Sequence, residues 1–134
     1  MKLFEGRCAV ITGAGSGFGR EFARIAARRK MQVVLADVQK DALKAVEAEL
    51  RAEGVDVIAQ PCDVSNETEV AALADAAFEH FGAVHLLFNN AGVATGGLTW
   101  EASAADWQWV LGVNVMGVVH GIKAFVPRMI AANE

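Results

Sequence analysis

The stretch TGAGSGFG, Thr12 to Gly19, constrains this chain more than any other. It follows a short apolar run and opens an amphipathic one. A strand, a glycine-rich turn and a helix in this order make a site for a pyrophosphate. Glycine lets the backbone approach the ligand, and the helix N-terminus offers free N–H groups with a partial positive charge. We therefore expect a dinucleotide site in which Gly13, Gly17 and Gly19 shape the turn.

The composition sets wide limits on what the chain does. Its 134 residues make at most one domain, and 54% hydrophobic with 21% charged residues is a globular composition. The net charge of −4 comes without a basic cluster, so nucleic acid and anionic membranes are not expected partners. No secretory pattern and no uninterrupted run of about 18 apolar residues is present, so no membrane partner is expected. Cys8 and Cys62 lack metal-site spacing, which favours free thiols in a cytoplasmic protein and no metal site.

The rest of the chain reads as strands that alternate with helices. Strands with little internal alternation, each joined to the next by a helix, predict an α/β fold with a parallel sheet covered on both faces. A chain reversal after the third strand gives a Rossmann-type sheet with the strand order 3-2-1-4. The expected strands are 7–12, 32–37, 55–60 (ended by Pro61) and 84–89, and the expected helices are Gly17–Arg29, Gln39–Glu53 and one from Ser65 or Asn66 to Gly82.

Two further expectations concern the helices. Phe18 shares an apolar stripe with Phe22 and Ile25, so its N–H is expected near the phosphates and its side chain in the core. Ser103–Ile130 reads as mostly helical, in one or two helices, and Pro127 is expected to kink or end it.

Asp37 predicts which cofactor is preferred. It ends the second strand about 20 residues beyond the glycine-rich turn, where a carboxylate accepts hydrogen bonds from the adenosine ribose hydroxyls. The 2′-phosphate of NADP would lie beside it, and like charges about 4 Å apart repel by about 4 kcal/mol at an effective dielectric constant of about 20. Even a heavily screened part of this energy exceeds the ~1.4 kcal/mol that makes a factor of ten. Because only Lys40 lies near in sequence to offset the charge, NAD is expected over NADP.

Together, the motifs resemble those of the short-chain dehydrogenase/reductase family over the whole chain. The glycine-rich turn matches its TGxxxGxG pattern, and Asn89-Asn90-Ala91-Gly92 matches its NNAG motif. Asp63 stands where the family has an acid beside the adenine, and Asn114 matches the asparagine in the middle of the family's long helix.

The resemblance implies roles for these residues. Asp63 and Val64 would flank the adenine, although Asp63 could instead cap the next helix. Asn90 and Gly92 would bring backbone close to the nicotinamide ribose, or merely form a turn. Ser16 would contact phosphate or ribose, or cap its helix. Asn114 would take a catalytic part, its main-chain carbonyl holding a water in a proton relay.

The chain also departs from the family. The family's chemistry needs a serine on the fifth strand and a tyrosine four residues before a lysine, and this chain has no tyrosine. It ends at Glu134, where the fifth strand is expected to begin. The interpretation is a partial NAD(P)-binding Rossmann domain over 1–134, truncated before strand 5 and without the catalytic half. It would bind NAD and hardly turn over, and the open edge of its fourth strand would favour self-association.

The expected function is that of an NAD-dependent oxidoreductase that transfers hydride between an alcohol and a ketone. A non-catalytic NAD-binding module and an interaction protein are the alternatives. A small alcohol or carbonyl substrate is expected, as is a homo-oligomer formed through the long helix 103–130, with Trp109, Val113 and Val118 as candidate interface residues. His80, His85 and His120 do not cluster in the sequence, so no catalytic histidine is expected.

Overall fold

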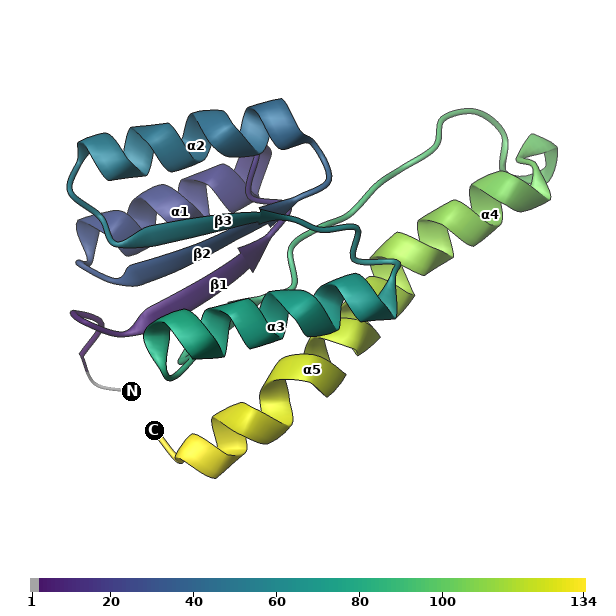
Figure 1. Ribbon diagram of the computed structural model, residues 1–134. Coiled ribbons are helices and arrows are strands. Elements are labelled where there is room, and N and C mark those ends of the chain that lie inside the picture. The colour runs from purple at the N-terminus through teal and green to yellow at the C-terminus, as the bar shows by residue number, and fades with distance from the viewer. Residues whose placement is uncertain (1–2) are drawn as a thin grey trace.

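One parallel sheet of four strands organises the molecule (Figure 1). The computed structural model describes residues 3–134, and its strand order β3-β2-β1-β4 confirms the predicted Rossmann-type arrangement. The strands are β1 (Cys8–Thr12), β2 (Gln32–Asp37), β3 (Val57–Pro61) and β4 (Leu86–Phe88). The helices are α1 (Gly17–Arg28), α2 (Lys40–Ala52), α3 (Glu67–Phe81), α4 (Ala104–Leu111) and α5 (Gly117–Ala132).

The two edge strands differ from the prediction. β3 ends with Pro61, which stands opposite Asp37 in the register, whereas the sequence had placed Pro61 just outside the strand. A proline fits there because β3 is an edge strand and its missing N–H removes no bond to a further strand. β4 has only three residues and pairs only with β1 among the described strands. The fourth strand is thus an edge in this structure, as the sequence predicted.

The residues of β1 are buried on both faces of the sheet, because helices cover each face. Cys8 and Val10 belong to a core cluster that includes residues of α3 and α5. Ala9 and Ile11 point the other way, into a cluster with α1 and α2. Figure 1 shows the same layers, with α1 and α2 on one side of the strands and α3 and α5 on the other. This two-sided burial explains why the strand is apolar throughout rather than alternating.

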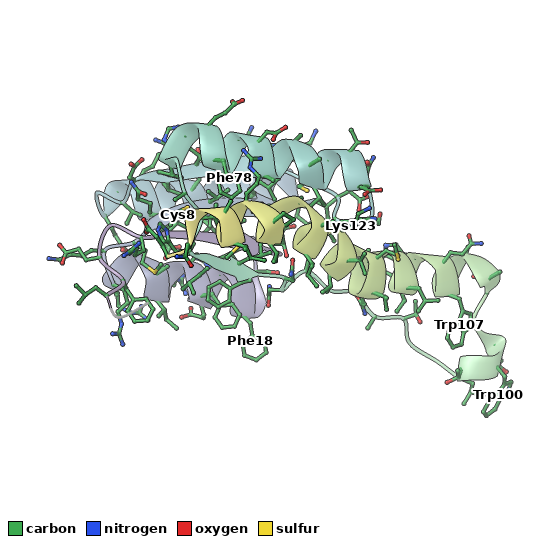
Figure 2. All side chains as sticks on the ribbon, turned by 90° about the horizontal axis from the view of Figure 1, so that it is seen from below. Cys8, Phe18, Phe78, Trp100, Trp107 and Lys123 are labelled. Carbon is green, nitrogen blue, oxygen red and sulfur yellow. The ribbon has the colours of Figure 1, made fainter. Side chains whose placement is uncertain are left out.

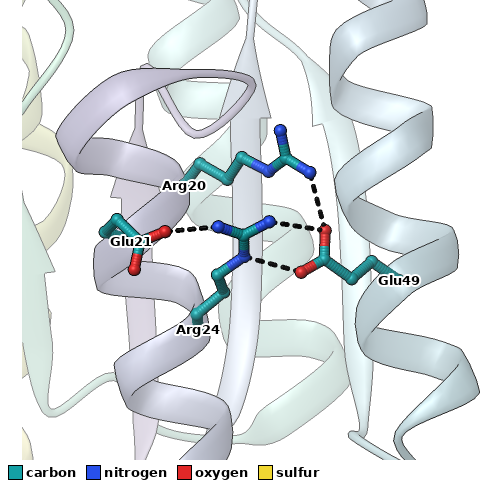
Figure 3. Close-up of polar contacts among 4 residues, drawn as sticks. All are labelled: Arg20, Glu21, Arg24 and Glu49. Atoms are coloured by element: carbon teal, nitrogen blue, oxygen red, sulfur yellow. Dashed lines mark hydrogen bonds and ion pairs between the residues drawn. The ribbon is translucent and has the colours of Figure 1, made fainter.

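An ion-pair cluster joins α1 to α2 (Figure 3). Glu49 Oε1 lies 2.6 Å from Arg24 Nε and its Oε2 lies 3.0 Å from Arg20 Nη2, while Glu21 pairs with Arg24 along α1. Hydrogen bonds from Arg24 and then from Arg20 lower the pKa of Glu49. Because these side chains remain partly exposed to water, their main effect is to hold the two helices in register and not to add much stability.

Two glycines let α5 lie close to the carboxyl end of the sheet. A methyl group at Gly121 would overlap the side-chain amide of Asn89, just beyond β4. One at Gly117 would come within 2.6 Å of Val64 Cγ2, in the turn after β3. Glycine at these two positions therefore allows the helix to pack closely against the turns after β3 and β4.

The long helix at the end of the chain is continuous. α4 passes into α5 through a π-helical turn, Gly112–Met116, and the helix then runs through Pro127 to Ala132. Of the two expected effects of Pro127, a kink or the end of the helix, the second is therefore wrong. Pro127 is exposed, so the backbone carbonyl that it leaves without an N–H partner can be hydrated.

The first part of this helix projects from the molecule (Figures 1 and 2). We call residues 98–111 the arm; it comprises the 3₁₀ turn Thr99–Glu101 and α4, and neither contains a buried residue. Figure 2 shows Trp100 and Trp107 at its far end, well away from the sheet. The exposed large apolar residues of the arm are Leu98, Trp100, Trp107, Trp109 and Leu111.

The long helix Ala104–Ala132, whose first part is α4 of the arm, corrects the interpretation that no segment is apolar enough to cross a membrane. Over Ala104–Ala132 it is long enough to cross a membrane, and its mean hydropathy reaches 1.5 in an 18-residue window of which 28% is buried. Scattered polar residues and glycines had hidden this character from a search for uninterrupted apolar runs. Core helices of soluble proteins meet the same criterion, so the helix qualifies by length and composition only.

Candidate functional site

The glycine-rich turn lies between the end of β1 and the start of α1. Gly13 and Gly17 have φ angles of 65° and 53°, in the left-handed region that favours glycine. A Cβ at Gly13 would lie 2.9 Å from Ala91 Cα, and one at Gly19 would overlap the carbonyl oxygen of Gly13. Each glycine of the predicted site therefore has its own steric reason, and together they leave the N-terminus of α1 open to a ligand.

Ser16 stands at the N-cap of α1 but makes no capping hydrogen bond with its side chain. The alternative that Ser16 serves to cap the helix is therefore not realised. Its hydroxyl remains exposed at the cavity described below and is available to a phosphate or ribose oxygen.

Asp37 is held at the carboxyl end of β2 by two backbone groups. Its Oδ2 accepts a hydrogen bond from Gly15 N at 2.8 Å, and its Oδ1 accepts one from Gln39 N, also at 2.8 Å. Each carboxylate oxygen keeps capacity for another donor. Asp37 forms no ion pair within residues 3–134, so its negative charge is not offset by a neighbouring side chain.

Thr12 and Asn90 join the ends of β1 and β4. Thr12 Oγ1 donates to Phe88 O at 3.3 Å and accepts from the N–H groups of Asn90 and Ala91, both at 3.1 Å. The Asn90 side chain donates back to Thr12 O at 3.0 Å. Sequence reasoning had not singled out Thr12, although a polar residue at the end of an apolar strand was a signal. Since the Asn90 side chain faces β1, what Asn90 offers a ligand is its backbone.

These elements enclose a cavity of about 480 Å³ at the carboxyl edge of the sheet. Most of the residues expected to bind a cofactor line it: Gly13, Ser16, Phe18, Asp37, Asp63, Val64, Asn90 and Gly92. Gly17 and Gly19 lie within the turn and do not line the cavity. Sequence reasoning had missed as lining residues Val38, Gln39, Cys62, Ala91, Val93, Trp109 and Val113.

The side chain of Phe18 is not in the core, contrary to expectation. It is 79% exposed and contacts the cavity, and its ring centroid lies 6.3 Å from that of Phe22 (Figure 2). Phe18 lies on the exposed side of the first turn of α1, whereas its neighbour Gly19 is buried. Ile25, which the sequence placed on the same stripe, is also exposed, at 45%.

The turn after β3 forms another wall of the cavity. Asp63 Oδ1 accepts hydrogen bonds from Ser65 N at 2.9 Å and from Ser65 Oγ at 2.6 Å. The N-cap of α3 is Asn66, whose side chain accepts from two N–H groups of the first turn of the helix. The alternative role of Asp63 as a helix cap is therefore wrong, and its carboxylate lies beside the cavity together with Val64.

Cys62 also touches the cavity, but its thiol is inert. Burial, and then the charges of Glu69 and Asp63, raise its pKa to about 12. Burial likewise raises the pKa of Cys8 to about 12. Both thiols are therefore protonated at neutral pH, which makes them weak nucleophiles. Within residues 3–134 no three His, Cys, Asp or Glu side chains form a group that could hold a metal ion.

Asn114 lies in the π-helical turn and fastens the loop after β4 to the long helix. Its Nδ2 donates to Val93 O and its Oδ1 accepts from Val93 N, both at 2.8 Å. It lines a second cavity, of about 320 Å³, between the loop 93–97 and the arm. π-Helical turns inside helices occur frequently at functional sites. The side chain of Asn114 is thus occupied, and a relay through this residue would use its main chain.

Two of the three candidate interface residues face the site instead. Trp109 and Val113 line the larger cavity, and Val113 is only 8% exposed. Their expected place in a subunit interface is wrong for Val113, which belongs to the core cluster next to α3. The helical period had not shown which face of the long helix turns toward the sheet.

The histidines lie at separate places, in keeping with the absence of a cluster in the sequence. His80 pairs with Asp56 just before β3, and His85 Nδ1 accepts from Cys8 N at the start of β1. His120 is buried in α5 behind the turn that carries Val64.

Comparisons with known proteins agree with this geometry. The family model described as short chain dehydrogenase matches residues 7–134. A CLA biosynthesis dehydrogenase/reductase of Lactiplantibacillus plantarum is 38% identical over 97% of this chain and 46% of its own length. The chain thus spans about half the length of the curated relatives that it matches.

Solved structures give the same result. A short chain dehydrogenase/reductase from Burkholderia phymatum, in complex with NAD, is 60% identical, with a TM-score of 0.98 over 100% of this chain and 48% of that one. A metagenomic short-chain oxidoreductase in complex with NADP is 35% identical, with a TM-score of 0.91 over 97% of this chain and 59% of that one.

Proposed function

The chain belongs to the short chain dehydrogenase family, and on this premise we propose that it forms the cofactor-binding part of an NAD-dependent oxidoreductase. The proposed reaction interconverts an alcohol and a ketone on a small substrate by hydride transfer. The observation that carries the proposal is Asp37, whose carboxylate is held by two backbone N–H groups at the edge of a cavity of about 480 Å³.

The residues of the cavity fit a dinucleotide. The turn between β1 and α1 is a cradle that side chains at Gly13 or Gly19 would fill, and it faces the N-terminus of α1, where a pyrophosphate is favoured. Asp37 would hold the adenosine ribose, and Asp63 with Val64 would flank the adenine. Asn90 and Gly92 would offer backbone to the nicotinamide ribose. When bound, the nicotinamide ring supplies or accepts the hydride.

The preference for NAD over NADP is also part of the proposal. A 2′-phosphate beside Asp37 would meet an uncompensated negative charge, because no ion pair of the described residues neutralises this carboxylate. The similar structure with 60% identity that contains NAD supports this choice, whereas the more distant one contains NADP.

The test is a fluorescence titration of the chain with NADH and with NADPH at equal ionic strength. NADH is expected to bind at least about tenfold more tightly. Equal affinities would refute the preference for NAD, and no binding of either would refute the cofactor site. Hydride transfer by the chain itself is expected to be slight, because it has no tyrosine and a positioned general acid contributes about 10²–10⁴ in rate.

We also propose that the protein forms a homo-oligomer through the long helix 103–130 and that it resides in the cytoplasm. The five exposed large apolar residues of the arm support an interface, because surfaces rich in exposed large apolar side chains often mark sites of protein association. Two free buried cysteines suit a reducing compartment. Sedimentation velocity at several concentrations tests the oligomer, and a monomer at all of them would contradict it.

A further inference from the structure

We propose that His120 is a positioning residue for the adenine-side wall of the cofactor cavity. Its ring holds the peptide that follows Val64 and, through that peptide, orients the carboxylate of Asp63. This inference rests on the proposed function, since it assumes that Asp63 and Val64 contact the adenosine half of a dinucleotide.

The first observation is the burial of His120. With Thr12 it is one of two buried polar residues within residues 3–134; His120 is 7% exposed and Thr12 is 4% exposed. Both lie behind the cavity, and each joins segments far apart in sequence. Thr12 links β1 to the end of β4, and His120 links α5 to the turn after β3. A buried polar side chain is destabilising unless it is hydrogen-bonded, so its partner identifies its role.

The partner of His120 is the carbonyl oxygen of Val64, 2.8 Å from Nδ1. A carbonyl oxygen only accepts, so Nδ1 carries a proton and donates. One turn earlier in α5, Gly117 lets the helix approach the same residue, since a Cβ there would lie 2.6 Å from Val64 Cγ2. The turn after β3 is thus held against α5 at its side chain and at its backbone.

The same peptide unit is held at its other polar end. The N–H that belongs with the Val64 carbonyl is that of Ser65, and it donates to Asp63 Oδ1 at 2.9 Å. A rotation of this peptide would break both hydrogen bonds together. His120 therefore prevents the rotation from behind the cavity, and the Asp63 carboxylate keeps the orientation in which it faces the adenine site.

The test compares two substitutions of His120 in the same chain. The side-chain NH₂ of asparagine occupies the position of Nδ1, so His120→Asn keeps the donor to Val64 O. Glutamine is nearer in volume to histidine but places its NH₂ further out, so His120→Gln fills the space and loses the bond. His80→Gln is the matched control, because His80 is exposed and lies at the opposite edge of the sheet.

Affinities are measured for NADH, for AMP as the adenine half and for nicotinamide mononucleotide as the other half. His120→Gln is expected to weaken NADH and AMP by the same factor, about tenfold, and to leave nicotinamide mononucleotide unchanged. His120→Asn is expected to stay within about twofold of the wild type for every ligand. If His120 only fills space, His120→Asn is instead expected to weaken NADH and AMP more than His120→Gln does.

The outcomes separate the two proposals. If the wild-type chain binds neither NADH nor AMP, both the proposed function and the role of His120 are refuted. If the wild type binds and the two His120 variants have equal AMP affinities, or if nicotinamide mononucleotide is weakened as much as AMP, only the role of His120 is refuted.

If circular dichroism shows that His120→Gln does not fold, nitrogen-15 NMR spectra of the wild type test the role of His120 instead. A protonated Nδ1, with a Ser65 amide that AMP protects from exchange and nicotinamide mononucleotide does not, supports the inference. An unprotonated Nδ1, or equal protection by both ligands, overturns it.

Discussion

The carboxyl edge of the sheet and the arm are both rich in apolar and small residues, yet they reach their structures by different means. At the edge, segments up to 79 residues apart are joined by hydrogen bonds, such as that between Ala91 and Thr12. The arm depends on local order, chiefly the capping box between Ser103 and Asp106 at the start of α4. Trp100 at its tip is 80% exposed, whereas Thr12 at the edge is 4% exposed.

The contrast shows what each region needs. The carboxyl edge of the sheet is organised by hydrogen bonds within the chain. Because its backbone groups are already held in place, little further ordering is needed when a ligand binds. α4 continues into the rest of the long helix through the π-helical turn, but none of its own residues is buried against another element. The arm needs another surface to cover its apolar side chains. The predictions below test this division, from the largest expected effect to the smallest.

The largest effect is expected from Gly19→Ala at the edge. The added methyl group would overlap the Gly13 carbonyl oxygen and displace the turn that we propose holds the phosphates. Overpacking of this kind destabilises by about 1–3 kcal/mol, and NADH binding is expected to fall by more than about a hundredfold. Thermal unfolding and NADH fluorescence measure both effects.

The matched control for this prediction is Gly96→Ala, in the loop that leads to the arm. A Cβ at Gly96 meets nothing within 4 Å, so stability and NADH affinity are expected to stay near those of the wild type. Equal losses in the two variants would show that the edge is no more constrained than the loop.

The next effect concerns the charge at the edge. Asp37→Asn removes the negative charge but keeps a side chain of the same shape, so NADH binding is expected to weaken about tenfold and NADPH binding to improve. The ratio of the two affinities, from parallel titrations, is the measured quantity. Asp106→Asn in the arm is the control and is expected to leave this ratio unchanged, while an unchanged ratio in Asp37→Asn would remove the basis for preferring NAD.

A smaller effect on folding, with a clear effect on association, is expected in the arm. Trp100→Ser combined with Leu111→Ser removes exposed apolar surface, so self-association is expected to fall. The free energy of unfolding is expected to change by no more than about 0.5 kcal/mol, because neither side chain is buried. Sedimentation velocity and denaturant unfolding are the measurements.

The control in this case is Ile25→Ser on α1. Ile25 is 45% exposed, close to the 49% of Leu111. It is expected to leave association as it is in the wild type. If Ile25→Ser reduces association as much as the arm variant does, then the arm is not the interface.

The smallest effect is a pH dependence at the opposite edge of the sheet. His85 Nδ1 accepts a hydrogen bond from Cys8 N at 3.0 Å, and burial, followed by the charge of Arg7, lowers the pKa of His85 below its ordinary 6.5. The unfolded chain therefore binds a proton more readily than the folded one. The contribution to stability is complete above pH 6.5 and is lost as the pH falls from there through the folded-state pKa.

Denaturant unfolding of the wild type and of His85→Asn between about pH 7.5 and pH 5 measures this dependence. Asparagine keeps an acceptor near the position of Nδ1 and does not titrate, so the decrease in stability below pH 6.5 is expected to be smaller in the variant. The same decrease in both proteins would assign it to other groups.

Much of the fold and part of the site follow from short stretches of sequence. The turn from Thr12 to Gly19, the apolar strands and the helices between them were predicted, and so was the strand order. The position of Asp37 was predicted as well, because it depends only on where the second strand ends and on the distance in sequence from the glycine-rich turn. Such features are local, or follow from rules of chain connection that hold across α/β proteins.

Other features required the tertiary structure. Phe18 and Val113 have similar local patterns of apolar neighbours, yet one is 79% exposed and the other 8%, because exposure depends on which elements happen to cover each helix face. The links from Thr12 to Asn90 and from His120 to Val64 join residues 78 and 56 apart in the chain, where no periodicity operates.

By itself the sequence determined a parallel sheet with a glycine-rich turn and an acid beside it, since glycine conformation, helix dipoles and charge act over a few residues. Only the tertiary structure decided how firmly that site is held and where apolar surface is left over. Hydrogen bonds across the sheet and burial between layers depend on the complete packing of the chain. The cavity is therefore held by bonds between residues distant in sequence, such as those from Asn90 to Thr12 and from His120 to Val64, and the arm stands apart from it.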